Sequence, residues 1–349
     1  MKAKLFFLRL ALVIGSPLLV LTLLEFALRL ATGGALYFTE KNPHYLHESD
    51  VVRLTPGIST WWYGCHYQIN AQAFRMPHEV GPKKGRRVLG LGDSVTLGMG
   101  VRDTADVWPN HLEKLLREKP AAAGPVEVIN AGVQGWNLLQ YDAAKQLVPA
   151  QFTRFMRERG PALAPDIVVY CICLNDIPSQ VTETFFADNA GNRNRFKLFP
   201  ESAREWFKRK AIYRLSRDGY RESRFQKLDF SGILTPPPTP DFQKRVSEEV
   251  GNLQQAVEAL GARLVCVIVP FSYQVLPANQ ELLKVNDFWH GVLDERRIPW
   301  TDLTPQFRPD NVLQYYALGD YIHLNAKGHA LIAAEAGKLI EPLLAAPAQ

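Results

Sequence analysis

Residues 87–98 have the sequence Arg-Val-Leu-Gly-Leu-Gly-Asp-Ser-Val-Thr-Leu-Gly, and this stretch decides the fold. The apolar run from Val88 to Leu91 predicts a short buried strand that ends in Gly-Asp-Ser. A polar, glycine-containing segment then leads toward a predicted helix. Because open α/β sheets bind ligands at the carboxyl ends of their strands, Ser94 is the first candidate for chemistry.

Three known motifs fail to match this stretch. A phosphate-binding P-loop requires a lysine, and none follows Gly98 or Gly100. The dinucleotide-binding fingerprint requires a third glycine where Val95 stands, and the Gly-x-Ser-x-Gly nucleophile elbow fails at Thr96. Two interpretations of Ser94 remain: a nucleophile, or a serine that caps a helix.

Length and composition are those of an ordinary globular protein. The 349 residues allow one large α/β domain with appendages, or two modest domains. The net charge of +5 does not by itself indicate nucleic-acid binding. Cys171 and Cys173 alternate in an apolar run, which predicts small buried strand residues rather than metal ligands, and nothing in the sequence requires a disulfide.

The first 31 residues differ in kind from the rest. Basic residues precede an uncharged run at 10–24, and the longer segment 5–28 would span about 36 Å as a helix, enough for a bilayer. A cleaved signal peptide is the alternative, but Glu25 and Arg29 stand where its cleavage site needs small neutral residues. We therefore expect a single-pass anchor of the inner (cytoplasmic) membrane, with the remaining chain on the periplasmic or extracytoplasmic side.

The rest of the chain divides into an aromatic-rich lead-in segment at 32–85 and a main domain at 86–349. The lead-in predicts short strands at 61–63 and 66–70. In the main domain, we expect strands at 88–91, 126–130, 167–174, 263–269 and 300–303, and helices at 106–119, 137–159, 247–260, 281–296 and 325–344. Strands that alternate with helices predict a parallel sheet covered by helices on both faces.

A basic insertion interrupts the main domain at about 177–241. Between positions 193 and 227 it has 12 Lys or Arg residues against four acidic ones. Helical patches are expected around 206–207 and 212–215. The insertion is interpreted as a solvated cap with a few apolar anchors; contact with an anionic membrane surface or an anionic glycan is the alternative.

Polar residues follow successive predicted strands, where they would converge on the carboxyl edge of one sheet. They are Ser94, the segment 130–136, Asn175-Asp176, and the segment 320–325 before the last helix. A serine nucleophile needs an adjacent base, for which His323 is the candidate, and the base needs a carboxylate to orient it, for which Asp320 is the candidate. The backbone N–H groups of Ser94 and Gly135 and the amide of Asn175 could stabilise an oxyanion.

With these residues the sequence resembles the SGNH/GDSL family of serine hydrolases. The resemblance rests on Gly92-Asp93-Ser94, Gly135, Asn175-Asp176 and Asp320-x-x-His323, and it covers about residues 87–344. It implies a flavodoxin-like, three-layer α/β/α sandwich, the SGNH hydrolase fold. It also implies hydrolysis or transfer of an ester-linked acyl group without a metal or organic cofactor.

Two positions depart from the family pattern. Cys173-Leu174 precede the Asn-Asp pair, where the family often has a glycine. Gly132 competes with Gly135 for the glycine block, and we choose Gly135 because its spacing from Asn130 fits the pattern better.

The expected function is therefore a membrane-anchored serine esterase with catalytic residues Ser94, Asp320 and His323. Its expected substrate is an acylated, above all acetylated, envelope or extracellular glycan, or a small ester, and no nucleic acid is involved. An O-acyltransferase that uses the same residues is one alternative. A catalytically silent glycan-binding or assembly protein is another. Acyl length, protein partners and oligomeric state stay open.

Overall fold

The computed structural model describes residues 2–31, 41–46, 52–118, 125–141, 147–149, 151–176, 210–227 and 240–345. Most of the basic insertion, including the helical patch expected at 206–207, lies outside these residues. The patch expected at 212–215 lies on a described helix, α7 (Ala211–Arg224).

A five-stranded parallel sheet forms the centre of the molecule. Its order is β11-β10-β9-β5-β6, with the bounds β5 (Arg86–Gly92), β6 (Val126–Gly132), β9 (Ile167–Ile172), β10 (Arg263–Ile268) and β11 (Trp300–Asp302). Every residue of β9 is buried, as expected for a strand covered on both faces. In this flavodoxin-like order the chain reverses direction across the sheet between β5 and β9, where such folds bind ligands.

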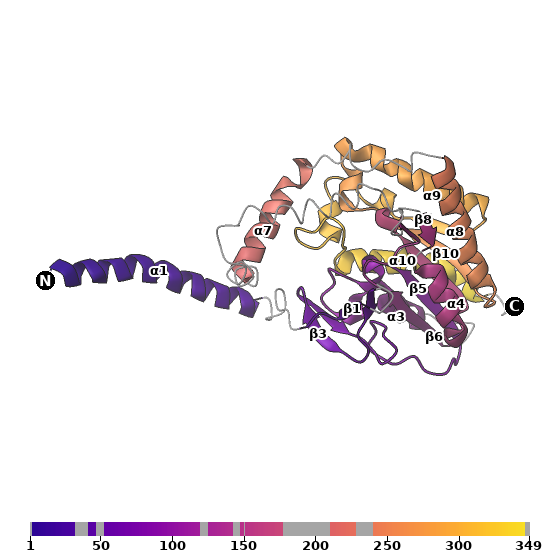
Figure 1. Ribbon diagram of the computed structural model, residues 1–349, viewed down its shortest axis with the longest axis horizontal. Coiled ribbons are helices and arrows are strands. Elements are labelled where there is room, and N and C mark those ends of the chain that lie inside the picture. Colours follow the sequence, from indigo (N-terminus) through magenta and orange to yellow (C-terminus); the bar gives the residue numbers. More distant parts are fainter. Residues whose placement is uncertain are drawn as a thin grey trace.

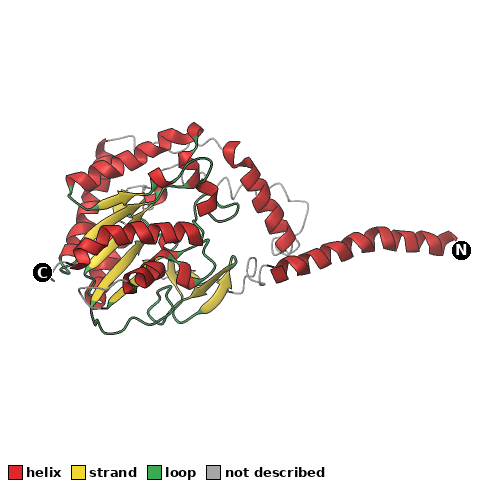
Figure 2. Cartoon of the chain, turned by 180° about the vertical axis from the view of Figure 1, so that it is seen from behind, coloured by secondary structure: helices red, strands yellow, loops and turns green. Residues whose placement is uncertain are grey.

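Helices cover both faces of the sheet (Figures 1 and 2). On one face, α3 (Trp108–Arg117) packs against α10 (Ala326–Ala345). On the other, α4 (Phe152–Leu163) packs against α8 (Pro240–Glu258), and right-handed crossovers place α9 (Lys284–Glu295) on the same side. The predicted α/β/α sandwich is confirmed.

The long helix expected at 137–159 is wrong in its first half. The chain instead forms two antiparallel strands, β7 (Leu139–Tyr141) and β8 (Leu147–Pro149), and α4 starts only at Phe152. Pro149 lacks the N–H group that a continuous helix would need, which explains why the helix begins after it. Gln151 stabilises this start, since its side chain accepts the N–H of Asn137 at 3.0 Å.

The lead-in segment forms two antiparallel strand pairs. β1 (His44–Leu46) pairs with β2 (Val52–Leu54), and β3 (Ser59–Trp62) pairs with β4 (Cys65–Gln68). The short strands predicted around 61–63 and 66–70 are thus confirmed, with boundaries shifted by one or two residues. The turn between β3 and β4 lies at Tyr63-Gly64, where both residues have positive φ values of 50° and 78°.

Arg75 joins this lead-in segment to the main domain. Its side chain is fully buried, and its guanidinium donates to the carbonyl oxygens of Leu97, Gly98 and Val101, which follow Ser94 in the chain, and of His66 on β4. The face of the guanidinium lies 4.2 Å from the Tyr67 ring. A buried cation held by carbonyl oxygens and an aromatic ring fixes the turn that follows the candidate nucleophile.

The N-terminal helix α1 (Lys2–Ala31) projects away from the globular part (Figures 1 and 2). Its segment Lys4–Ala31 is long and apolar enough to span a membrane, a test that a signal sequence also passes. Near its end, Glu25 accepts the N–H groups of Ala211 and Ile212 at 3.0 and 3.1 Å and pairs with Arg29 at 2.8 Å. The Glu25 carboxylate therefore caps the first turn of α7.

Candidate active site

Ser94 stands at the carboxyl end of β5, at the point where the strand order reverses. It opens α2 (Ser94–Leu97), a helix of one turn that ends at Gly98 with a φ of 89°. Asp93 caps this helix by accepting the N–H of Val95 at 2.8 Å. The side chain of Ser94 is buried but not sealed, since 7% of its surface is exposed.

A chain of two hydrogen bonds connects Ser94 to His323 and Asp320. The Ser94 Oγ lies 2.9 Å from His323 Nε2, and His323 Nδ1 lies 2.7 Å from Asp320 Oδ2. The other oxygen of Asp320 accepts the backbone N–H groups of Ile322 and His323 at 2.9 and 3.1 Å. Both carboxylate oxygens are therefore fixed, and the carboxylate fixes the orientation of the imidazole.

The charges of this pair suit proton transfer. Burial alone would raise the pKa of Asp320, but the facing His323 and the two backbone N–H groups lower it to about 2. Burial likewise works against the charged imidazole, but the Asp320 carboxylate, with a contribution from Asp93, raises the pKa of His323 above its usual value. With Asp320 ionised, Nδ1 carries the proton and Nε2 is free to accept the proton of the Ser94 hydroxyl.

The loop that carries Asp320 and His323 is held at several points. Its ends are joined because Ala317 N–H donates to the carbonyl of His323 at 2.9 Å. Asn325 caps the following helix α10 through the N–H groups of Lys327 and Gly328. Upstream, the Tyr316 hydroxyl donates to the carbonyl of Pro270, which ties the loop to the end of β10. The geometry of the pair thus follows from the fold around it.

Two glycines follow Asn130, and the structure assigns them different places. A Cβ on Gly132 would lie 2.1 Å from the backbone nitrogen of Leu97, so this glycine allows β6 and α2 to approach each other. Gly135 is exposed, has a φ of 76° and has open space around its Cβ position. Within the described residues, no acceptor takes its N–H group, and the same holds for Ser94.

Asn175 lies in a short 3-10 helix, Leu174–Asp176, at the end of β9. One N–H of its side-chain amide donates to Asp93 Oδ2 at 2.8 Å. The amide nitrogen carries a second N–H, which this bond leaves available to another acceptor. The neighbouring Asp176 is fully buried and caps the turn, since its Oδ2 accepts the N–H of Cys173 at 2.7 Å. The Asn-Asp pair is thus divided between a side chain near Ser94 and a structural cap.

The structure brings together the sequence-predicted Ser94, Asp320 and His323 by direct hydrogen bonds, and it connects Asn175 to the turn of Ser94 through Asp93. Gly135 lies on the loop after β6 without a direct contact to these side chains. The neighbouring Trp136 is 6% exposed and donates its indole N–H to the carbonyl of Val52 at 2.8 Å.

Sequence reasoning missed the role of Asp93 and the contact between Phe225, just after α7, and the loop that carries Asp320 and His323. An aspartate directly before a helix is a known cap, so Asp93 had a local signal. Phe225, just after α7, is fully buried and its ring centroid lies 5.6 Å from that of Tyr321, between Asp320 and His323. No local sequence pattern predicts this contact, because Phe225 and Tyr321 are far apart in the chain.

The described part of the chain contains no group of three or more His, Cys, Asp or Glu side chains placed to hold a metal ion. Its four cysteines are all buried and free.

Comparison with known proteins places the chain in a family. Residues 91–331 match the GDSL-like lipase/acylhydrolase family. A search of curated protein sequences gives no significant match. Solved structures that resemble the chain include a carbohydrate acetylesterase from Sinorhizobium meliloti, with 11% identity, a TM-score of 0.42, and coverage of 74% of this chain and 99% of that one. An aryl esterase from M. smegmatis has 12% identity, a TM-score of 0.43 and the same coverage.

The family match spans well over half of the chain and includes both Ser94 and the pair Asp320 and His323. The chain belongs to the GDSL-like lipase/acylhydrolase family, the SGNH hydrolases, and is thereby a hydrolase that acts on esters.

Proposed function

We propose that the protein is a serine esterase that removes acyl groups, above all acetyl groups, from an envelope or extracellular glycan through an acyl-enzyme intermediate. The observation that carries this proposal is the hydrogen-bonded chain from Ser94 Oγ through His323 to Asp320, formed by residues 229 positions apart. A serine that merely caps a helix would not need an imidazole and a carboxylate aligned behind its hydroxyl.

In the first half of the reaction, Ser94 Oγ attacks the carbonyl carbon of the ester while His323 Nε2 accepts the hydroxyl proton. Asp320 stabilises the resulting imidazolium. When the tetrahedral intermediate collapses, the bond to the alcohol oxygen breaks and His323 returns the proton to that oxygen. The alcohol leaves, and the acyl group stays on Ser94.

In the second half, His323 accepts a proton from water, whose oxygen attacks the acyl carbon. The bond to Ser94 Oγ breaks, the proton returns to Ser94, and the carboxylic acid leaves. The same site could pass the acyl group to a sugar hydroxyl. Which acceptor enters after the alcohol has left decides between hydrolysis and transfer.

The oxyanion of both intermediates needs preorganised donors, and the proposed ones are the N–H groups of Ser94 and Gly135 and the second amide N–H of Asn175. Three features support this assignment. The N–H groups of Ser94 and Gly135 have no acceptor within the described residues, Gly135 faces open space, and Asn175 is held by Asp93.

We further propose that residues 1–31 form an uncleaved anchor, that residues 32–85 form a lead-in segment, and that the esterase domain, residues 86–349, lies on the extracytoplasmic side. The contact of Glu25 with the first turn of α7 supports an uncleaved helix, because cleavage would remove that cap. The basic N-terminus supports the orientation.

Replacement of the nucleophile tests the mechanism most directly. Detergent-solubilised full-length protein should release p-nitrophenol from p-nitrophenyl acetate, and Ser94→Ala should reduce kcat/KM at least about 10³-fold. A fluorophosphonate should label the wild type at Ser94. Ser223→Ala, on the exposed side of α7, is the control and should keep full activity. Equal activity of wild type and Ser94→Ala would refute the mechanism, and activity only with an added saccharide acceptor would indicate transfer.

The pH profile tests the role of Asp320. Hydrolysis requires neutral His323, so the wild-type rate should fall as the pH drops through the raised pKa of this imidazole. Asp320→Asn removes the charge that raises this pKa, so the acid limb of kcat/KM should move to lower pH while kcat falls by about 10⁴-fold. An acid limb that does not move would show that Asp320 does not act on His323.

Loss of one oxyanion donor should affect the transition state more than substrate binding. Asn175→Ala should lower kcat by about 10²- to 10³-fold with little change in KM. Thermal unfolding of the variant controls for the lost hydrogen bond to Asp93. A rise in KM at unchanged kcat would instead place Asn175 in ground-state binding of the substrate.

Cysteine labelling tests the anchor. All four native cysteines are buried, so an introduced cysteine gives the signal. Tyr220, which is 66% exposed on α7, should react as Tyr220→Cys with a membrane-impermeant maleimide in cells whose outer barrier is open. Lys4→Cys should react only after the inner membrane is permeabilised. N-terminal sequencing should find the mature chain intact, and a start beyond residue 31 would refute the anchor.

A further inference from the structure

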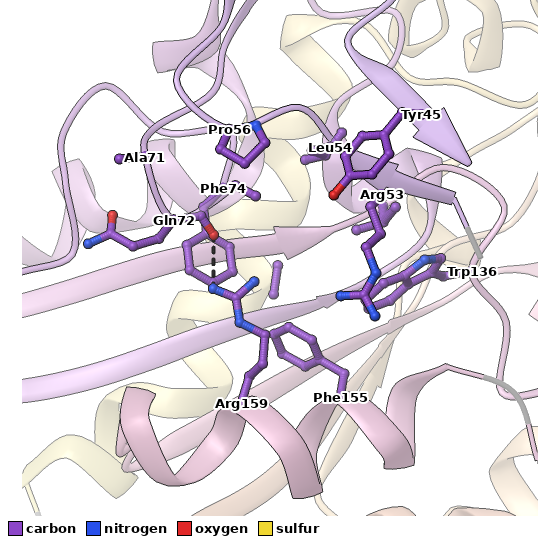
Figure 3. A pocket seen from close by; sticks show the side chains of 13 residues that line it. Tyr45, Arg53, Leu54, Pro56, Ala71, Gln72, Phe74, Trp136, Phe155 and Arg159 are labelled. Carbon is purple, nitrogen blue, oxygen red and sulfur yellow. Dashed lines mark hydrogen bonds between the residues drawn. The ribbon is translucent and has the colours of Figure 1, made fainter. Parts of the chain in front are cut away.

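A pocket of about 270 Å³ is lined in part by Val133 and Trp136, which flank Gly135 on the loop after β6. The lead-in segment forms one side of it, with residues of β2 and of the 71–74 turn. The end of β6, the loop that follows it and α4 form the other side (Figure 3). Pockets for drug-sized ligands measure about 300–1,000 Å³, so this one suits a single small group such as one sugar ring.

Two arginine side chains, Arg53 from β2 and Arg159 from α4, reach into this pocket (Figure 3). None of the lining residues is acidic. Among the residues that the structure describes, neither arginine forms an ion pair with a carboxylate, and Arg53 Nε is buried without a hydrogen-bond partner. Buried polar groups in proteins nearly always form hydrogen bonds, so we expect a bound ligand to accept a hydrogen bond from this nitrogen.

Arg159 is held in place by its neighbours. Its guanidinium donates to the carbonyl of Gln72 at 2.8 Å and lies 4.6 Å from the Phe74 ring and 5.7 Å from the Phe155 ring. Burial, together with the charge of Arg53, lowers the pKa of Arg159. The two cations thus repel each other in a partly dry pocket, and an anion between them would relieve this repulsion.

We propose that this Arg53–Arg159 pocket binds an acidic sugar, a carbohydrate ring that carries a carboxylate or a phosphate group. Guanidinium groups bind both oxyanions through two parallel hydrogen bonds. The Tyr45 ring, which is 41% exposed, lines the pocket beside the two cations and can face a sugar ring (Figure 3), whereas the Phe74 ring is buried against Arg159. The two guanidinium groups select the anion, and the Tyr45 ring favours an anion carried on a sugar ring over a free ion.

The pocket shares a loop with the proposed oxyanion site. Val133 and Trp136 line the pocket, and Gly135 lies between them in the chain. The acidic unit bound here therefore belongs to the acylated glycan, next to the sugar whose ester is cleaved. This last step rests on the proposed esterase function, whereas binding of the acidic sugar does not.

Isothermal titration of detergent-solubilised full-length protein tests the binding. Glucuronate and glucose 6-phosphate should bind, and neutral glucose should bind at least about tenfold more weakly, as the loss of charge-assisted hydrogen bonds predicts. Equal affinity for glucuronate and glucose would overturn the proposal. Inorganic phosphate that binds as tightly as glucose 6-phosphate would overturn the assignment to a sugar.

Two arginine variants test whether the acidic sugar binds in this pocket. Arg53→Gln should weaken glucuronate binding at least about tenfold. Arg154→Gln is the matched control, because Arg154 lies on the same helix as Arg159, is 56% exposed and pairs with Glu158. It should leave the affinity unchanged. Unchanged affinity in Arg53→Gln would overturn the proposal, and the comparison of glucuronate with glucose in the wild type remains decisive if this variant does not fold.

Kinetics separate this inference from the proposed function. An acetylated methyl glucoside linked to glucuronate should be hydrolysed with a higher kcat/KM than the same acetylated glucoside linked to glucose, and Arg53→Gln should remove the difference. Ser94→Ala should abolish hydrolysis but keep glucuronate binding. Binding without any esterase activity in the wild type would refute the proposed function alone, and activity with equal kcat/KM for both substrates would refute the link between the pocket and the substrate.

Discussion

The hydrogen bond of 2.8 Å between Asn175 Nδ2 and Asp93 Oδ2 joins the ends of β9 and β5, the two strands that flank the reversal point of the sheet. The same Asp93 carboxylate caps the one-turn helix that begins at Ser94. Burial raises the pKa of Asp93, and the two hydrogen bonds it accepts offset part of that effect. One buried carboxyl group thus contacts both Asn175 and the turn of Ser94, whose Oγ lies 2.9 Å from His323 Nε2.

A second constraint acts on the other end of that helix. Arg75 donates to the carbonyl groups of Leu97, Gly98 and Val101, which no regular secondary structure satisfies. Among the residues that the structure describes, no carboxylate pairs with its buried charge, and removing the side chain would leave the carbonyl oxygens of Leu97 and Val101 unpaired. The lead-in segment is therefore more than a spacer between α1 and the sheet. It supplies the side chain that closes the nucleophile turn.

Local patterns in the sequence were sufficient for the sheet and for the choice of candidate residues. Apolar runs such as 167–174 predict strands because the central strands β5, β9 and β10 are buried along most of their length, and the order of strands and helices then restricts the topology. The helix expected at 137–159 was wrong in its first half only, because helical periodicity does not reveal the strand pairing of residues 139–141 with 147–149. The roles of Arg75 and of the Arg53–Arg159 pocket could not be predicted, because both depend on residues that only the folded chain brings together.

The same limit hid the contacts that connect α1, through α7, to the loop that carries Asp320 and His323. The first turn of α7 is capped by Glu25 of α1, and just beyond its end Phe225 packs on Tyr321, between Asp320 and His323. A carboxylate inside the hydrocarbon core is costly, so Glu25 belongs at the interface, where Arg29 and two backbone N–H groups satisfy it. With α1 as the proposed anchor, α7 would keep the catalytic loop at a fixed place relative to the membrane surface. The charges of Glu25 and Arg29, which argued against a cleavage site, then have a structural use, since Glu25 connects α1 to the first turn of α7.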